Sequence, residues 1–276
     1  MAALLAVMSS LMWGTADFIG GVTSRRLPAL AVYGLAQGVG FVVLVGIATL
    51  SGGWSREPGY WPWAIGASVL SLVAMVAFYQ ALAIGPMGIV SPLVSLSVLV
   101  PVAVSLIRGE QPVPIQVLGI ILAVVGILLA SGPELSGAES ARPLLLAGAA
   151  ALGFGGMYVL MAEGSQHDAL MTMTGMKVTS VVIFAVVLVA VRSVGGAGRR
   201  DVLPIVVIGV FDAGANVTFG VATTTGLLST TSVLGSLYPV VTAILAAIFL
   251  RERLRAVQYA GVAAALAGVL MIASAG

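Results

Sequence analysis

Long apolar stretches, separated by short polar, Pro-rich or Gly-rich segments, make up almost the whole chain. A lipid hydrocarbon core is roughly 30 Å thick, so a helix needs about 20 apolar residues to cross it. Ten stretches meet this length when they are cut at the polar segments: 3–22, 29–50, 61–83, 87–107, 114–131, 142–161, 170–191, 202–222, 226–249 and 255–274. The pattern predicts an all-α polytopic membrane protein with ten transmembrane helices.

The second half of the chain repeats the first. At an offset of 141 residues, Trp13-Gly14, Phe78, Ala81 and Gly85 fall on Phe154-Gly155, Phe219, Ala222 and Gly226. At 142 residues, Glu110, Gln116, Gly119 and Gly126 fall on Glu252, Gln258, Gly261 and Gly268. The copies are residues 3–131 and 142–274, and the longest polar stretch separates them. Because each copy holds an odd number of spans, we expect two inverted five-helix repeats, the usual build of a secondary transporter.

The composition agrees with a membrane protein and excludes several other classes. Hydrophobic residues make up 60% of the chain and charged residues 8%, whereas charged residues are about a quarter of a soluble domain. The few basic residues offer no cluster for a nucleic-acid partner. With no cysteine and one histidine, the sequence predicts no His/Cys metal site and no cofactor. We expect a multi-pass protein of the cell (inner or plasma) membrane that binds a small-molecule substrate.

The end of each copy carries the same motif. An apolar span leads to Glu110 or Glu252 at its exit, and a Gln and a Gly then open the next span. Together with Trp13-Gly14 in the first span and Phe78-Tyr79-Gln80-Ala81-Leu82 in the third, this motif resembles the EamA-type domains of the drug/metabolite transporter superfamily. The resemblance covers both halves. It implies a ten-helix transporter that works by alternating access, in a family that carries amino acids, sugars, nucleotide sugars, purines or toxic organic compounds, often as exporters.

The orientation in the membrane stays open at this point. On the side of the termini lie Arg56 and Arg108, and on the other side lie nine arginines: Arg25, Arg26, Arg142, Arg192, Arg199, Arg200, Arg251, Arg253 and Arg255. Since basic residues favour cytoplasmic loops, this count places the termini outside. The family resemblance implies instead that both termini are cytoplasmic.

Three ionisable residues lie inside predicted spans, namely Asp17, Lys177 and Asp212, and Asn216 shares a helix face with Asp212. A charge inside a span costs at least about 2.5–3.5 kcal/mol on insertion scales, so it normally faces the bundle interior or water. From the rise per residue, Lys177 lies roughly 10 Å, Asp212 about 15 Å and Asp17 about 21 Å from the side of the termini. We expect Lys177 and Asp212 to form an ion pair. Either Asp212 with Lys177, or Asp17 alone, binds substrate or exchanges a proton. The alternatives are a static salt bridge that satisfies buried charges and, for Asp17, a place at the far interface with Arg25 and Arg26.

Polar and aromatic side chains form a second group of candidates for lining a cavity: Trp13, Gln37, Tyr79, Gln80, Tyr158 and Tyr238. Trp13 is equally suited to core packing. Serines recur at one-turn spacing near prolines in the fourth and ninth spans, at Ser91, Ser95, Ser232 and Ser236. A proline frees a backbone carbonyl in a span, so these hydroxyls either form a ligand cradle with it or bond back to their own helix.

The glutamates of the repeated motif favour a structural role. Glu110 and Glu252 lie at helix exits beside arginines, Arg108 and Arg251 among them, and we expect structural or gating ion pairs there. Direct substrate contact is the other interpretation. The heptad-spaced glycines in the fifth and tenth spans suit close helix packing within the chain or a dimer seam. We therefore expect a monomer or a homodimer.

The sequence favours one function over two alternatives. We expect a secondary active transporter of small organic solutes (a metabolite, an amino acid or a drug-like compound), an exporter driven by proton exchange, and not an enzyme. A non-transporting membrane receptor or scaffold would lack a water-accessible cavity at mid-depth. An intramembrane diaspartyl enzyme needs two carboxylates that share a proton, but Asp212 lacks the Gly-x-Gly-Asp loop of that class, and its depth differs from that of Asp17 by about 6 Å.

Overall fold

The computed structural model describes residues 1–24, 26–84, 94, 96–130, 141–191, 196–249 and 255–274, and in these residues all regular structure is helical. The helices are α1 (Ala2–Ser24), α2 (Ala29–Leu50), α3 (Trp61–Ile84), α5 (Leu99–Ile107), α6 (Pro114–Ala130), α7 (Ala141–Val191), α8 (Val202–Thr225), α9 (Leu228–Gly235), α10 (Tyr238–Phe249) and α11 (Ala256–Ser274). Short 3-10 turns are η1 (Gly53–Ser55), η2 (Pro58–Tyr60), η3 (Leu96–Val98) and η4 (Arg199–Asp201).

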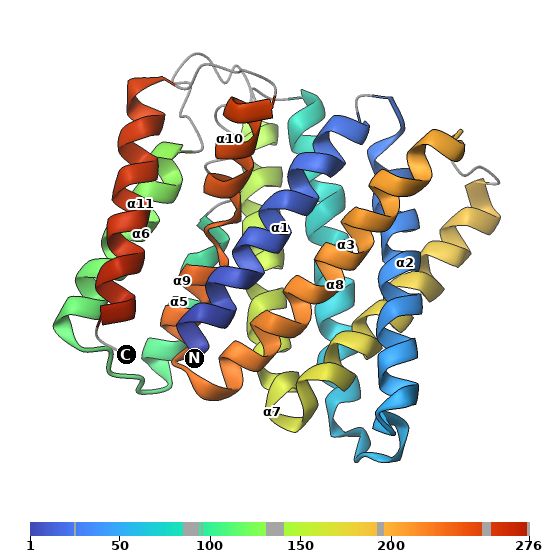
Figure 1. The fold of residues 1–276 in the computed structure, drawn as a ribbon, viewed down its shortest axis with the longest axis horizontal. Helices are drawn as coiled ribbons and strands as arrows, with labels where there is room; N and C mark the ends of the chain where they lie inside the picture. Colours follow the sequence, from blue (N-terminus) through green and yellow to red (C-terminus); the bar gives the residue numbers. More distant parts are fainter. Residues whose placement is uncertain are drawn as a thin grey trace.

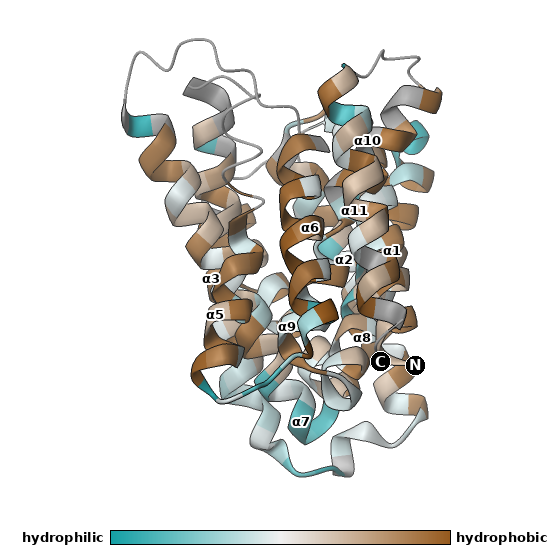
Figure 2. Cartoon of the chain, turned by 90° about the vertical axis from the view of Figure 1, so that its left-hand side faces the viewer, coloured by the Kyte–Doolittle hydropathy of each residue, from teal (hydrophilic) through white to brown (hydrophobic). Residues whose placement is uncertain are grey.

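The two halves of the bundle run in opposite directions. Both termini lie at the same end of the molecule (Figure 1), which we call the terminal face; the opposite end is the far face. Helix α1 starts at the terminal face, whereas α7 starts at the far face and runs back towards the terminal face. Apolar residues cover most of the helices, and polar residues gather at the terminal face around the bend of α7 (Figure 2). The predicted all-α fold with two repeats in inverted orientation is confirmed.

Five helical segments within the described residues are long and apolar enough to cross a membrane: Ala2–Ser24, Leu30–Leu50, Pro58–Phe78, Leu144–Val186 and Arg199–Thr225. The count of ten spans stays a prediction. Segment Leu144–Val186 contains parts of two predicted spans, because α7 is two helices joined at Asp168, whose backbone is extended (φ −163°, ψ 113°). Asp168 Oδ1 accepts a hydrogen bond of 2.8 Å from the N–H of Met171. Asp168 therefore acts as the N-cap that starts the second half of α7.

The predicted span 226–249 is broken near its midpoint. Helix α9 ends at Gly235, and α10 starts at Tyr238 after a turn at Ser236 and Leu237. Pro239 has no N–H to donate to the carbonyl of Gly235, so a regular helix cannot continue through this point. Every residue of α9 is buried, which fits the rule that irregular backbone in a membrane lies inside the protein.

The duplication in the sequence is also present in the packing. Helix α1 packs along α8, and α7 packs along α3, so the first helix of each repeat contacts the third helix of the other. Trp13 on α1 lies 5.6 Å from Phe219 on α8, and the aligned pair Phe154 and Phe78 lies at 6.4 Å (ring centroids). The same side-chain contact is thus made twice across the boundary between the repeats.

The glycines of the fifth and tenth spans lie inside the chain, where α6 packs against α11. A Cβ on Gly126 would come within 2.3 Å of the backbone nitrogen of Ala265, and a Cβ on Gly268 within 2.6 Å of that of Ala123. These glycines therefore allow two backbones to approach, as small residues do in membranes. Each of these two helices also starts with the motif glutamine: Gln116 Oε1 accepts from Val113 N–H (3.0 Å), and Gln258 Oε1 from Arg255 N–H (2.9 Å).

We expect Gly126→Ala to destabilise the protein. Alanine favours a helix by roughly 0.5–1 kcal/mol over glycine, but overpacking costs about 1–3 kcal/mol, and the clash here is with backbone that cannot rotate away. The measurement is the melting temperature in detergent, followed by size-exclusion chromatography. Gly148→Ala is the matched control, because its Cβ would meet nothing within 4 Å. Equal melting temperatures for the two variants would contradict the close α6–α11 contact.

Candidate functional site

Three polar side chains from three helices meet in the middle of the bundle. Lys177 on α7 forms a salt bridge with Asp212 on α8, so the ion pair expected from residue depth is present. The Lys177 ammonium also donates to Oε1 of Gln37 on α2 (2.6 Å), and Gln37 Nε2 donates to Asp212 Oδ2 (3.4 Å). Lys177 is 4% exposed and Gln37 6% exposed. The buried ammonium is therefore held by one partner from its own repeat and one from the other.

Asp212 is the accessible member of this network. Its side chain is 22% exposed, against 6% for that of Lys177. Asn216, one turn further on α8, donates through Nδ2 to Asp212 Oδ1 (3.2 Å) and to the Asp212 carbonyl (2.7 Å). Because Lys177 and Asn216 hold one oxygen each, the orientation of the carboxylate is fixed. The residues aligned with Lys177 and Asp212 in the first repeat are Ala36 and Ser71, so the charge centre occurs once.

A cluster of aromatic rings lies beside this network. Trp13 on α1 contacts Tyr158, Phe219 and Tyr238, with ring centroids 5.8, 5.6 and 6.5 Å away. Tyr158 and Phe219 lie 5.3 Å apart. Trp13 and Tyr158 are buried, so Trp13 packs in the core, as one of the two interpretations expected. The cluster joins α1 and three helices of the second repeat.

Asp17 lies one helical turn beyond Trp13 on α1, on the same face of the helix. It is exposed, although the neighbouring residues Ala16 and Trp13 are buried. Its carboxylate interacts electrostatically with Asp212 and with the hydroxyls of Tyr158 and Tyr238. Asp17 therefore lies on the side of α1 that faces Asp212 and the two tyrosines.

The remaining candidates divide into three groups. Ser232 is buried in α9, and its hydroxyl has no hydrogen-bond partner among the described residues, so the structure does not show it bonded back to its own helix. Ser236 is buried beside α9, next to the hydroxyl of Tyr158. Gln80 lies exposed near the end of α3. Other candidates lie outside the described residues, as whole residues for Ser91, Ser95, Arg251 and Glu252, and as a side chain for Tyr79.

The terminal face carries a second polar cluster, and one expectation there was wrong. Arg108 does not pair with Glu110; it forms a salt bridge with Glu163 on α7. The Glu110 carboxylate instead accepts hydrogen bonds from the N–H groups of Leu228 (2.8 Å) and Ser229 (3.1 Å) and from the Ser229 hydroxyl (2.9 Å). Glu110 is thus the cap of α9, because the free N–H groups of a helix start attract a carboxylate.

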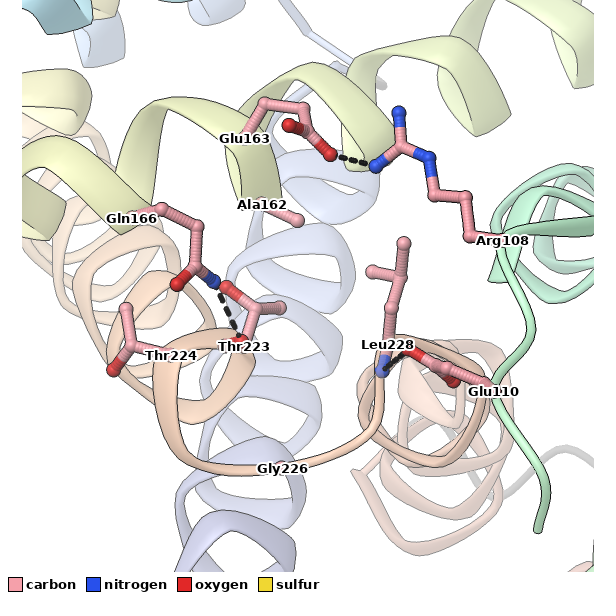
Figure 3. Close-up of a pocket in the computed structure, with 9 residues that line it drawn as sticks. All are labelled: Arg108, Glu110, Ala162, Glu163, Gln166, Thr223, Thr224, Gly226 and Leu228. Atoms are coloured by element: carbon pink, nitrogen blue, oxygen red, sulfur yellow. Dashed lines mark hydrogen bonds and ion pairs between the residues drawn. The ribbon is translucent and has the colours of Figure 1, made fainter. Parts of the chain in front are cut away.

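Two further contacts complete this cluster. Arg56, between α2 and α3, forms a salt bridge with Asp168 at the bend of α7. A cavity of about 380 Å³ opens beside the Arg108–Glu163 pair and the Glu110 cap, and Gln166 and Thr223 also line it (Figure 3). Glu163 and Asp168 could not be recognised as partners from the sequence beyond their place at a span end, because both are distant from their arginines along the chain.

The contacts of the terminal face differ in strength. The side chains of Arg108 and Arg56 are 52% and 46% exposed, and exposed ion pairs are worth about 0–1 kcal/mol each. A hydrogen bond to a charged group is worth about 1.5–3 kcal/mol, and Glu110 accepts three in a half-buried position. The Glu110 cap is therefore the main interaction of this face.

Comparisons with known proteins identify the family. The sequence model of the EamA-like transporter family matches the chain twice, over residues 1–132 and 141–274. The chain belongs to this family. The resemblance inferred from the repeated motif is confirmed, and the EamA-like chain is a multi-pass membrane transporter of the drug/metabolite transporter superfamily.

The fold of this EamA-like protein is shared with solved structures. A crystal structure of another protein superposes with a TM-score of 0.81 and 19% sequence identity, over 98% of this chain and 95% of the other. At this identity the likeness concerns the fold alone. No curated protein matches the chain. Within the described residues, no group of three or more His, Cys, Asp or Glu side chains is placed to hold a metal ion.

The accessibility of Asp17 can be tested directly, because the chain has no cysteine. We expect Asp17→Cys to react rapidly with a water-soluble thiol reagent that is added at the far face, since thiolates form in water. Ala16→Cys is the matched control and should react slowly, because Ala16 is 4% exposed. The measurement is the rate of labelling in membrane vesicles of each orientation. If Asp17→Cys reacted no faster than Ala16→Cys, Asp17 would face lipid and not an aqueous space.

Proposed function

We propose that this EamA-like protein is a secondary active exporter of small organic solutes that carry an amine, and that it exchanges them for protons by alternating access. The observation that carries the proposal is the central site, in which Asp212 is paired with the Lys177 ammonium and a second carboxylate, Asp17, interacts electrostatically with Asp212. Two carboxylates and one ammonium leave a net charge of about −1, which suits a cationic or zwitterionic solute. The export direction rests on the family resemblance.

The surroundings of the site support this substrate class. The ring cluster around Trp13 lies one turn from Asp17, and an ammonium beside an aromatic face is attracted by about 0.5–2 kcal/mol. Flat or aliphatic parts of a solute would contact the same rings. A site with one anchoring charge and an apolar wall accepts metabolites, amino acids or drug-like amines.

Competition for the carboxylates supplies a physical basis for exchange. The excess negative charge of Asp17 and Asp212 is costly in a poorly hydrated site, and it is neutralised either by a proton or by a substrate cation. The two ligands exclude each other, so a site that releases one on one side of the membrane can take up the other. In each full cycle the site then carries a solute molecule across the membrane in one direction and a proton in the opposite direction.

Two other functions are less well supported. A receptor or scaffold would have its buried charges sealed from solvent, whereas Asp17 is exposed and Asp212 is partly exposed. A diaspartyl enzyme needs two carboxylates that share a proton, whereas Asp212 is held by Lys177 and Asn216. The family is a transporter family.

We expect Asp212→Asn to abolish transport while folded protein remains in the membrane, because Lys177 keeps its bond to Gln37. The measurement is solute flux in proteoliposomes over a panel of amines, amino acids and neutral metabolites. The double variant Asp212→Asn/Lys177→Gln distinguishes a site from a static salt bridge, because it leaves no unpaired charge. Inactivity of both variants agrees with the proposal. Recovery of flux in the double variant would make the pair structural.

We expect Asp17→Asn to lose the dependence of flux on a pH gradient. Asparagine keeps the shape of the side chain but cannot exchange a proton, so any remaining flux should be downhill and insensitive to pH. The measurement compares wild type and variant with and without an imposed gradient. Asn216→Asp is an informative partner, since it adds a titratable group at the same site. A gradient-driven flux that survives in Asp17→Asn would remove Asp17 from the coupling.

A further inference from the structure

All the cross-repeat polar contacts described at the terminal face connect the first repeat to the same two elements of the second. Arg56 and Arg108 pair with Asp168 and Glu163 at the bend of α7, and Glu110 caps the start of α9. Figure 3 shows Arg108 and Glu110 reaching from one chain segment to the two elements on either side of the cavity. Any movement that separates the repeats at this face must break these contacts.

Behind these contacts lies the wholly buried helix α9, with the hydroxyl of Ser232 unpartnered. Asp17, one helical turn beyond Trp13 of the ring cluster, is exposed. The described structure therefore holds the two repeats together at the terminal face, while Asp17 beside the ring cluster is exposed. The described part of the far face has a cross-repeat ion pair as well, between Arg26, which is 41% exposed, and Asp201, which is 2% exposed.

We propose that Glu110, supported by the Arg108–Glu163 and Arg56–Asp168 pairs, is the latch that closes the terminal face in the transport cycle and positions α9 behind it. The proposal rests on the proposed transport function and deepens it. When the latch opens, α9 loses its cap and the hydroxyls of Ser232 and Ser236 become accessible to the solute. Glu110 is a positioning residue, because it touches the helix that lines the path and not the solute.

This assignment explains why the motif glutamate follows a span exit. At that place a carboxylate can reach the next repeat without crossing lipid, and the N–H groups of a helix start bind it more strongly than water does. The contact is also reversible, because both the carboxylate and the N–H groups are solvated when separated. An ion pair buried at mid-depth would not open in this way, since each charge would be left in a poorly hydrated site.

The test is the labelling of Ser232→Cys with a membrane-impermeant thiol reagent added at the terminal face. In an otherwise wild-type chain we expect slow labelling. Adding Glu110→Gln removes a charged acceptor from the cap, and we expect labelling about tenfold faster, the change that one weakened charge-assisted bond produces in a two-state equilibrium. Glu57→Gln is the matched control, because Glu57 is an exposed acid at the same face whose side chain makes no cap; it should leave the rate unchanged.

The reciprocal measurement separates a latch from a general loosening of the fold. In the Glu110→Gln background, Asp17→Cys should label more slowly from the far face, because opening one face closes the other. Faster labelling at both faces, or no change at either, would overturn the proposal. These rates require no solute, so they can fail or succeed independently of the proposed transport.

The ion pairs provide a second route if Glu110→Gln does not yield folded protein. Arg108→Glu places two acids together and should accelerate labelling of Ser232→Cys at the terminal face. Adding Glu163→Arg restores an attractive pair in reversed order and should return the rate to that of the wild-type background. A rate that stays high in the double variant would show that the pair does not hold this face closed.

Discussion

The need to satisfy one ammonium group in the middle of a membrane-spanning bundle constrains the rest of this structure. An isolated charge at that depth costs at least about 2.5–3.5 kcal/mol, and Lys177 is 4% exposed. Its partners Asp212 and Gln37 come from α8 and α2, so α2, α7 and α8 must meet at one depth. The helix packing around the centre, including the contacts of α2 with both α7 and α8, follows from this requirement.

The charged centre is also where the similarity between the two repeats ends. Packing residues are duplicated: the Trp13–Phe219 contact has its counterpart in Phe154 and Phe78, and the glycines of α6 face those of α11. The charged residues are not, since Ala36 and Ser71 stand where the second repeat has Lys177 and Asp212. Lys177 and Asp212 belong to one repeat and move with it. Gln37 belongs to the other repeat. A displacement of one repeat relative to the other would therefore change its two hydrogen bonds, of 2.6 Å to Lys177 and 3.4 Å to Asp212.

Much of the fold could be predicted from the sequence, because the thickness of a bilayer and the odd number of spans per copy leave few arrangements. The Lys177–Asp212 pair could be predicted as well, since depth along two antiparallel helices follows from the rise per residue. The break after Gly235 was not predicted, although it has a local cause in Pro239, which lacks an N–H. The role of Glu110 could not be predicted, because neighbours in sequence suggested Arg108 as its partner, whereas the start of α9 lies 118 residues away. Contacts between repeats depend on three-dimensional packing that no local spacing encodes.

The polar contacts of the terminal face and those of the buried centre differ in their access to water. At the terminal face the acids and bases reach water, so the Glu110 cap and the exposed ion pairs can separate at a cost of a few kcal/mol and form again. In the centre the Lys177–Asp212 pair cannot separate without leaving a buried charge, which costs about 3–5 kcal/mol, and only a proton or a bound cation can change its charge balance. We therefore assign the opening of the terminal face to its surface contacts and the recognition of the solute to the buried Lys177–Asp212 centre. A conformational change that breaks only the surface contacts lets the centre stay intact while its access changes from one face to the other.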